Sequence, residues 1–254
     1  MFDVKGKVAV VTGSATGIGR AAALMLAERG CGVVINYTRS EAEAQQTAEE
    51  ARAFGVPALV HRCDISSDAD VRAMMKRTVD ELGRLDALIC NAGTAFRVPH
   101  EDLEGLTDEI WDRILAVNVK GTFYCIRAAA PYMKAQGRGA IAITGAGAGV
   151  AGGGSSIAYA ASKGALLTMT ISLARVLAPE IRINIASPSG VDTRWMPRLI
   201  GEEAWAQSRA RYEASPLRRT TTAEDVAEVL VSLITSADMV TGQNVNIGGT
   251  HFGR

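Results

Sequence analysis

Two residues that could do acid–base chemistry, Tyr159 and Lys163, lie four positions apart in a segment of small residues followed by an apolar run. This composition predicts a helix, and the spacing places both side chains on one helix face. A phenol is a weak acid with a reference pKa of about 10, and a neighbouring ammonium favours the phenolate. Such a pair could exchange a proton with an alcohol or a carbonyl. By itself, however, the pair is more typical of a surface tyrosine beside a solvated lysine.

The overall composition is that of an ordinary globular protein. The chain has 254 residues, is 48% hydrophobic and 21% charged, and its 27 basic side chains balance 27 acidic ones. A net charge of zero gives no electrostatic reason to expect a nucleic acid or an acidic membrane as partner. No apolar run reaches the ~18 residues of a membrane-spanning helix, and the N-terminus lacks the apolar core of a signal peptide.

The cysteines and histidines give no sign of a metal or redox site. The four cysteines are scattered without a C-x-x-C spacing, and the three histidines match no ligand spacing. We therefore expect free thiols, no metal ion and a reduced, cytoplasmic location.

Strand-like and helix-like segments alternate along the chain. The strands are unbroken apolar runs, which are typical of a parallel sheet covered by helices on both faces. We therefore predict a single α/β domain over residues 1–254, a doubly wound Rossmann-type parallel sheet of seven strands. The predicted strands are 7–12, 33–36, 58–62, 87–90, 140–144, 182–186 and 244–247, and the predicted helices are 19–29, 41–54, 67–82, 107–135, 157–178 and 222–234.

Three helix starts carry the spacing of a capping box, in which a hydroxyl and a carboxylate three residues later bind each other's backbone N–H groups. Ser40 and Glu43 have this spacing, and so do Ser67 and Asp70, and Thr222 and Asp225. In contrast, Asn118 lies in the middle of the predicted helix 107–135, three residues before Gly121. Asparagine and glycine are poor helix formers, so the hydrogen-bond ladder could break there, although Asn118 by itself would be read as a structural residue.

A glycine-rich turn follows the first predicted strand, where residues 12–19 read Thr-Gly-Ser-Ala-Thr-Gly-Ile-Gly. Backbone N–H groups at a helix start attract a pyrophosphate, and glycines let the backbone approach it closely. Between a strand and a helix this pattern predicts a dinucleotide site in preference to a plain turn, and it lacks the Gly-Lys-Ser/Thr of a Walker loop. The predicted contacts are Gly13, Ser14, Thr16, Gly17, Ile18 and Gly19.

The end of the second predicted strand indicates which dinucleotide is bound. A carboxylate there would bind the ribose 2′-hydroxyl of NAD, whereas an arginine would suit the 2′-phosphate of NADP. No acidic residue precedes Glu41, and Arg39 could bind a phosphate with the hydroxyls of Thr38 and Ser40 as further donors. The alternative is that Arg39 is a solvated loop residue. The charges favour NADP over NAD.

Further polar residues follow the third and fourth predicted strands, at the edge where a doubly wound sheet binds its ligand. Asp64, with Ile65 beside it, could accept a hydrogen bond from the adenine amino group, or it could only cap a helix. Asn91, Ala92 and Gly93 could likewise contact the dinucleotide or be simple turn residues.

Together these segments resemble the short-chain dehydrogenase/reductase family over essentially the whole chain. Residues 12–19 look like its TGxxxGIG motif, residues 91–93 like its NAG motif, Asn118 like its active-site asparagine, and Tyr159 with Lys163 like its catalytic pair. Pro188, Val191 and Thr193, with Ser189 after Pro188, are similar to the segment that contacts the nicotinamide carboxamide in the family, although Ser189 itself departs from the family pattern.

The resemblance implies a function. Tyr159 would be the proton donor or acceptor, Lys163 would lower its pKa and hold the nicotinamide ribose, and Asn118 would help to fix a proton-relay water. Hydride would pass between the nicotinamide and a carbonyl or secondary alcohol, as in 3-oxoacyl reductases, with the cofactor carrying the chemistry. The family commonly forms tetramers, so a homotetramer or homodimer is expected, with helices 107–135 and 157–178 as the dimer face.

The chain departs from the family pattern at the catalytic serine, whose position is taken by Ala146. Loss of such a donor typically costs about 10²–10³ in rate. Thr144 could replace it, because a residue two positions earlier points to the same side of an extended chain. Ser155 or Ser156 could instead reach the site from the next loop. The third alternative is a dinucleotide-binding protein with weak or no turnover, acting as a sensor or an assembly subunit.

A second departure is Ser189, which stands where the family usually has a glycine.

The substrate side is expected over residues 192–219, where apolar side chains could form a lid over the nicotinamide. An ordinary amphipathic helix pair would have the same composition, and the arginines of this segment are expected to be solvated. The apolar lid candidates are Trp195, Met196, Leu199, Ile200 and Trp205.

Overall fold

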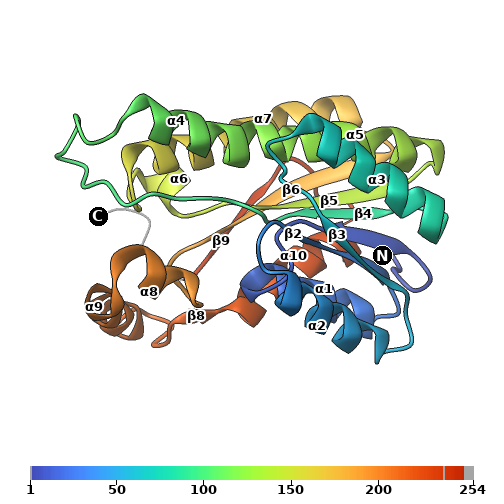
Figure 1. Ribbon diagram of the computed structural model, residues 1–254, viewed down its shortest axis with the longest axis horizontal. Helices are drawn as coiled ribbons and strands as arrows, with labels where there is room; N and C mark the ends of the chain where they lie inside the picture. The colour runs from blue at the N-terminus through green and yellow to red at the C-terminus, as the bar shows by residue number, and fades with distance from the viewer. Residues whose placement is uncertain (1, 237, 249–254) are drawn as a thin grey trace.

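A seven-stranded sheet runs through the centre of the molecule (Figure 1); the computed structural model describes residues 2–236 and 238–248. Every pairing in this sheet is parallel, in the order β3-β2-β1-β4-β5-β6-β9. The predicted α/β class and the seven parallel strands are therefore confirmed. The strands are β1 (Val8–Val11), β2 (Gly32–Tyr37), β3 (Ala58–Arg62), β4 (Ala87–Cys90), β5 (Gly139–Thr144), β6 (Ile181–Pro188) and β9 (Asn244–Ile247).

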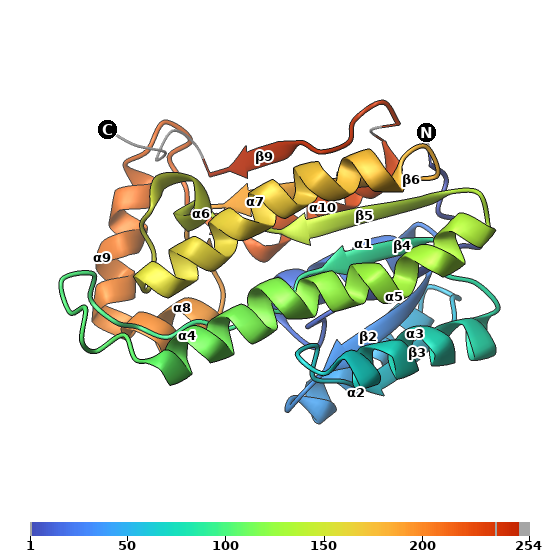
Figure 2. The same cartoon turned by 90° about the horizontal axis from the view of Figure 1, so that it is seen from above.

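Helices cover both faces of the sheet (Figures 1 and 2), with α1, α2 and α10 on one side and α3, α5 and α7 on the other. Strand β1 shows why the apolar runs require two layers. Ala9 and Val11 pack into the core on the α1 side, Val10 packs into the core on the α3 side, and all three are fully buried. The helices are α1 (Gly17–Glu28), α2 (Glu41–Arg52), α3 (Asp68–Leu82), α4 (Asp108–Ile114), α5 (Thr122–Ala135), α7 (Ile157–Leu177) and α10 (Ala223–Thr235).

The prediction of one continuous α-helix over 107–135 is wrong, because the α-helix is interrupted near its middle. A π-helical segment, η1 (Leu115–Gly121), separates α4 from α5 at the place where Asn118 weakens the ladder. Gly121 closes this segment against the chain after β3, because a Cβ there would lie 2.9 Å from the Ile65 carbonyl oxygen. The wider π-helical turn breaks the regular backbone ladder, and the Asn118 side chain is buried within this segment.

The carboxyl ends of the strands point toward α8 (Trp195–Ile200) and α9 (Glu202–Glu213), as Figure 2 shows. Three short elements at this end have no counterpart in the sequence prediction: α6 (Ala148–Ala151) and the paired strands β7 (Val191–Asp192) and β8 (Thr221–Thr222). Each is too short to leave a periodic pattern in the sequence. They bring the chain after β5 and the chain after β6 to the same end of the sheet as α8 and α9.

Helix α2 starts without the predicted capping box. Ser40 makes no capping hydrogen bond; its Oγ accepts instead from Arg194 Nη2 at 3.3 Å, and Glu43 Oε1 accepts from Arg194 Nη1 at 2.9 Å. The box predicted at α10 does form, with Thr222 Oγ1 accepting from Asp225 N and Asp225 Oδ2 accepting from Thr222 N. The prediction at α2 is wrong because a distant arginine binds both side chains.

Within the described ranges, α7 is the one helix whose length and composition would allow it to cross a membrane. It packs against β6, and Leu166, Ala174 and Leu177 belong to the core on that face of the sheet. Part of its apolar surface therefore belongs to the core, while Ile171 and Val176 are exposed. All four cysteines are buried and unpaired, as the sequence predicts.

Candidate active site

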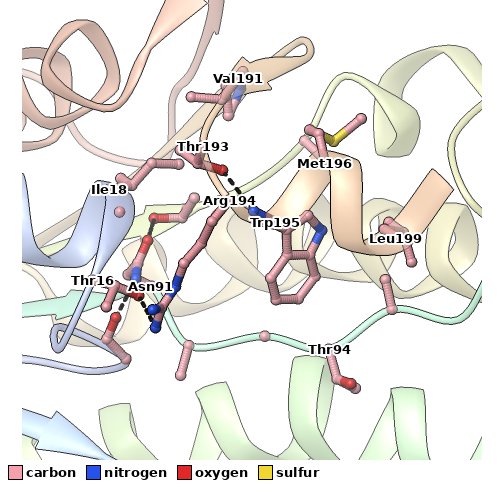
Figure 3. Close-up of a pocket in the computed structure, with 18 of the residues that line it drawn as sticks. Thr16, Ile18, Asn91, Thr94, Val191, Thr193, Arg194, Trp195, Met196 and Leu199 are labelled. Carbon is pink, nitrogen blue, oxygen red and sulfur yellow. Dashed lines mark hydrogen bonds between the residues drawn. The ribbon is translucent and has the colours of Figure 1, made fainter. Parts of the chain in front are cut away.

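A cleft of about 590 Å³ opens at the carboxyl ends of the central strands (Figure 3). Its walls are the turn before α1, the segments after β4 and β5, the start of α7, and the chain from the end of β6 into α8. Most of the residues predicted from the sequence meet here: Gly13, Thr16, Gly17, Ile18, Thr38, Asn91, Ala92, Gly93, Thr144, Tyr159, Lys163, Pro188, Ser189, Val191 and Thr193.

The glycine turn leaves open the space that a dinucleotide phosphate would need. Gly13 and Gly17 have φ values of 63° and 60°, a region that side chains disfavour. A Cβ on Gly13 would lie 2.9 Å from Ala92 Cα, so the turn packs directly on the chain after β4. A Cβ on Gly17 would project into the gap toward Thr193, 3.8 Å from its Cγ2. The turn therefore fits a pyrophosphate at the start of α1.

Two polar residues that the sequence argument did not select hold this turn. Asn36 Oδ1 accepts from Gly13 N at 2.9 Å, while Asn36 Nδ2 donates to the Cys63 carbonyl oxygen at 3.1 Å. Thr12 Oγ1 accepts from the backbone N–H of Asn91 at 2.9 Å, which ties the turn to the end of β4. The signal in the sequence was a buried polar residue at the end of an apolar strand, since such a group needs partners.

Several predicted cofactor residues lie behind or beside the cleft. Ser14 is buried and donates to the Val11 carbonyl oxygen at 2.6 Å, so it shapes the turn from below. Gly19 packs under the turn, Ile65 is in the core, and Arg39 is exposed. Asp64 pairs with Arg113 at 3.1 Å.

Tyr159 and Lys163 stand side by side at the start of α7. Lys163 Nζ lies 5.8 Å from the centroid of the Tyr159 ring and donates to the Thr144 carbonyl oxygen at 2.9 Å. Ser156 caps the helix, its Oγ accepting from Tyr159 N at 3.2 Å. Gly154 lies against the tyrosine ring, because a Cβ there would be 3.2 Å from Tyr159 Cδ1. These contacts fix the ring and the ammonium in the cleft.

Burial sets the protonation of this pair. Burial raises the pKa of Tyr159 to about 12 and lowers the pKa of Lys163 to about 8. The sequence argument expects the lysine to lower the tyrosine pKa; in the protein alone, loss of solvation outweighs that attraction. At neutral pH the tyrosine is therefore a neutral phenol beside a predominantly cationic lysine. A neutral phenol is a proton donor.

Asn118 does not line the cleft and is fully engaged by protein groups. Its Oδ1 accepts from Thr94 N at 2.8 Å, and its Nδ2 donates to the Thr94 carbonyl oxygen and to Ser162 Oγ, both at 3.0 Å. Ser162 Oγ in turn donates to the Tyr159 carbonyl oxygen at 2.7 Å. The side chain of Asn118 thus joins η1 to α7 and to the segment after β4.

Of the residues from the end of β5 to the start of α7, only some can offer a hydroxyl group to the cleft. Ala146 lines the cleft and offers no donor. Thr144 also lines it, and its Oγ1 donates to Asn91 Oδ1 at 3.2 Å. Ser155 and Ser156 are not among the lining residues: the Ser155 Oγ is buried without a hydrogen-bond partner among the described atoms, and Ser156 caps α7. Thr144 is therefore the one of the three candidate donors that faces the cleft.

The α8 side of the cleft carries three apolar side chains and two arginines, Arg194 and Arg198. Trp195, Met196 and Leu199 line it, and Figure 3 shows them opposite the chain after β4. Trp205 is instead buried behind them, with its Nε1 donating to Asp192 Oδ1 at 3.3 Å. Among residues 2–236 and 238–248, no group of three or more acidic, histidine or cysteine side chains could hold a metal ion.

This architecture defines a Rossmann-type α/β protein, and comparison with known proteins identifies its family. A family model described as enoyl-(acyl carrier protein) reductase matches residues 13–251. A Streptomyces violaceoruber protein assigned as ketoacyl reductase 2 of the granaticin polyketide synthase is 38% identical over 246 residues, covering 96% of both chains. The 3-oxoacyl-(acyl-carrier-protein) reductase of Staphylococcus aureus is 33% identical, covering 96% of this chain and 97% of the relative.

Solved structures agree with the sequence comparisons. The crystal structure of NAD⁺-bound xylitol dehydrogenase superposes with a TM-score of 0.88 at 29% identity, covering 97% of this chain and 99% of that one. Levodione reductase gives a TM-score of 0.89 at 26% identity, with 98% of each chain covered. The chain therefore belongs to the short-chain dehydrogenase/reductase family and is an oxidoreductase.

Proposed function

We propose that this protein is an NADP(H)-preferring dehydrogenase/reductase that acts on a carbonyl or secondary alcohol, with Tyr159 as the proton donor. The observation that supports it best is the cleft itself, which brings Tyr159 and Lys163 within reach of the glycine turn before α1. The relatives named ketoacyl reductase and 3-oxoacyl reductase favour a 3-oxoacyl substrate or one like it. We place all of residues 1–254 in one domain.

The residues of the chain would act as follows. When bound, the nicotinamide supplies or accepts the hydride. Tyr159 gives its phenolic proton to the substrate oxygen, and the Lys163 ammonium stabilises the phenolate that remains. Thr144 donates a hydrogen bond to the same substrate oxygen, in place of the hydroxyl that Ala146 lacks. Asn118 positions α7 through Ser162, and its contacts keep the tyrosine backbone fixed.

The dinucleotide would lie along the cleft from the end of β2 to the end of β6. Gly13, Thr16, Gly17 and Ile18 would hold the pyrophosphate, and Thr38, Arg39 and Ser40 would bind the 2′-phosphate. The absence of an acidic residue in 36–40 supports NADP over NAD. Pro188, Ser189, Val191 and Thr193 lie at the nicotinamide end. The Asp64 carboxylate would accept hydrogen bonds both from Arg113 and from the adenine amino group.

Residues 192–219 would form a lid on the substrate side. Trp195, Met196 and Leu199 supply an apolar wall that suits an acyl chain, and a hydrogen bond from Trp205 to Asp192 joins α9 to the start of the segment. Apolar walls with few polar groups are usual in sites for small organic ligands.

We also propose a homodimer or homotetramer that pairs through α5 and α7. Phe123 on α5, with Ile171 and Val176 on α7, are exposed apolar side chains on these neighbouring helices. Burying them against a second copy would remove apolar surface from water.

A carbonyl panel tests the proposed activity against the rival function of a dinucleotide-binding sensor. We expect the protein to oxidise NADPH with at least one 3-oxoacyl thioester or small ketone, and NADH more slowly. The measurement is the loss of absorbance at 340 nm with each cofactor, together with cofactor binding by calorimetry. If the protein bound a cofactor tightly but turned over none of the substrates, the result would favour the sensor.

The pH dependence of the reduction follows from the lysine. Because the pKa of Lys163 is lowered to about 8, its ammonium is present below that pH and is lost as the pH rises through it. We expect kcat/KM for carbonyl reduction to be flat from about pH 6 to 7 and to fall through about pH 8, since kcat/KM reports the free enzyme.

A Lys163→Met variant is the matched control for this profile. It should be slower at every pH and should lack the decline near pH 8, because no ammonium remains to titrate. A wild-type profile that rises through pH 8 would exclude a protonated lysine as the supporting charge.

A further inference from the structure

One arginine of the α8 side reaches across the cleft to the nucleotide side. Arg194 Nη2 donates to Thr16 Oγ1 at 3.1 Å and to Ser40 Oγ at 3.3 Å, and its Nη1 donates to Glu43 Oε1 at 2.9 Å. Figure 3 shows the Arg194 side chain extending toward Thr16. A single guanidinium thus connects the chain entering α8 with the starts of both α1 and α2.

The partners of this arginine are unusual for a solvated side chain. Ser40 and Glu43 have the spacing of a capping box, yet both turn their side chains to Arg194 instead of to the α2 backbone. Loss of a helix cap is destabilising, so the contacts with Arg194 replace an interaction that would otherwise stabilise the start of α2. The guanidinium also holds the pKa of the Glu43 carboxyl below its usual range, so this partner is a carboxylate at neutral pH.

The position of the guanidinium coincides with the place proposed for the 2′-phosphate. Ser40 is one of the hydroxyls assigned to that phosphate, Thr38 lines the cleft beside it, and Thr16 belongs to the phosphate-binding turn. Arginine offers two parallel N–H donors in a rigid plane, which matches a phosphate as well as it matches a carboxylate. Arg39, the arginine chosen from the sequence, is exposed and has no partner within the described residues.

We propose that Arg194 determines the preference for NADP(H) by pairing with the 2′-phosphate of the adenine ribose, and that Glu43 is the counterion that holds it there in the free protein. This inference rests on the proposed function and names a residue of its cofactor site. The phosphate replaces the Glu43 carboxylate as partner of Nη1, while Ser40 and Thr16 keep the guanidinium over the cleft.

Because of Glu43, the site favours NADPH when Arg194 is present and NADH when Arg194 is removed. With Arg194 in place, the positive charge of the guanidinium compensates the repulsion between the bound phosphate and the displaced Glu43 carboxylate. Without it, an unpaired Glu43 repels a phosphate and is free to accept a hydrogen bond from a ribose 2′-hydroxyl, the role that a carboxylate plays toward NAD. Removal of the arginine should therefore reverse the preference and not merely weaken binding.

The test is the ratio of NADPH and NADH dissociation constants, measured by calorimetry on the full chain. Arg194→Gln should weaken NADPH by about 10- to 100-fold, the range for hydrogen bonds to charged groups, and leave NADH unchanged or slightly tighter. Arg194→Lys should retain part of the preference, because it keeps the charge and loses the fork. Adding Glu43→Gln to Arg194→Gln should recover part of the NADPH affinity by removing the repulsion.

Arg211→Gln is the matched control, since Arg211 is an exposed arginine of α9 that bonds Ser208 on its own helix and does not line the cleft. It should change neither constant. Equal losses of NADPH and NADH in Arg194→Gln, or no loss of either, would overturn the inference while leaving the proposed function in place. A wild-type protein that binds NADPH no more tightly than NADH would instead contradict the proposed cofactor preference itself and the inference with it.

Discussion

Replacing Tyr159 with phenylalanine is expected to lower kcat for carbonyl reduction by about 10³, within the range of positioned acid–base groups, with NADPH affinity nearly unchanged. The phenol is the proton donor in the proposed mechanism, and no carboxyl, imidazole or thiol group lines the cleft in the described part of the chain. Its aromatic ring packs against Gly154, and phenylalanine keeps that packing. The loss should therefore appear in kcat and not in folding or binding.

Steady-state rates with NADPH and calorimetric binding of NADPH separate these effects. Tyr124→Phe is a suitable control, because Tyr124 lies on α5, packs beside Arg127 and does not line the cleft. It should leave kcat within about twofold of the wild type, as expected of a substitution away from the site. A Tyr159→Phe enzyme with the wild-type rate would exclude the tyrosine as donor.

Replacing Thr144 with valine is expected to lower kcat/KM by about 10², the cost of removing one hydrogen-bond donor from a substrate oxygen. Thr144 is the candidate donor that lines the cleft, and its bond to Asn91 Oδ1, at 3.2 Å, is longer than a typical O–H···O bond. The hydroxyl can therefore turn to a substrate oxygen at small cost. Thr144→Ser keeps the hydroxyl and should retain most of the activity.

A rescue experiment assigns the role to the hydroxyl. In the Thr144→Val background, Ala146→Ser should restore much of the lost rate, because Ala146 lines the same cleft two residues further along the chain. The measurement is kcat/KM for the single and double variants on one substrate. An unchanged rate in Thr144→Val would show that the reaction proceeds without this donor.

The fold could be predicted from the sequence because its signals are local and repeated. Unbroken apolar strands alternating with capped helices leave few arrangements other than a parallel sheet covered on both faces, and the seven strands appear close to their predicted positions. The interruption of helix 107–135 at Asn118 had a local cause that the sequence contains. The two-residue strands β7 and β8 and the single turn α6 are too short to produce such a pattern.

The site could be predicted only where a recognisable motif marks it. The glycine turn after β1 and the pair Tyr159 and Lys163 on α7 carry such motifs, and both contribute residues to the cleft. Arg194 could not be found in this way, because its partners Ser40 and Glu43 are about 150 residues away in sequence and appeared to form a local cap. The protonation of the tyrosine also escaped prediction, since burial depends on the folded structure.

The most direct test of the central claim is the fate of the hydride. NADPH carrying deuterium at the transferable C4 position is incubated with the protein and a 3-oxoacyl thioester, and the alcohol product is analysed by mass spectrometry. The proposed mechanism predicts one deuterium at the former carbonyl carbon, formed rapidly by the wild type and about 10³ times more slowly by Tyr159→Phe. Binding of NADPH with no deuterium in any product, across the carbonyl panel, would contradict it.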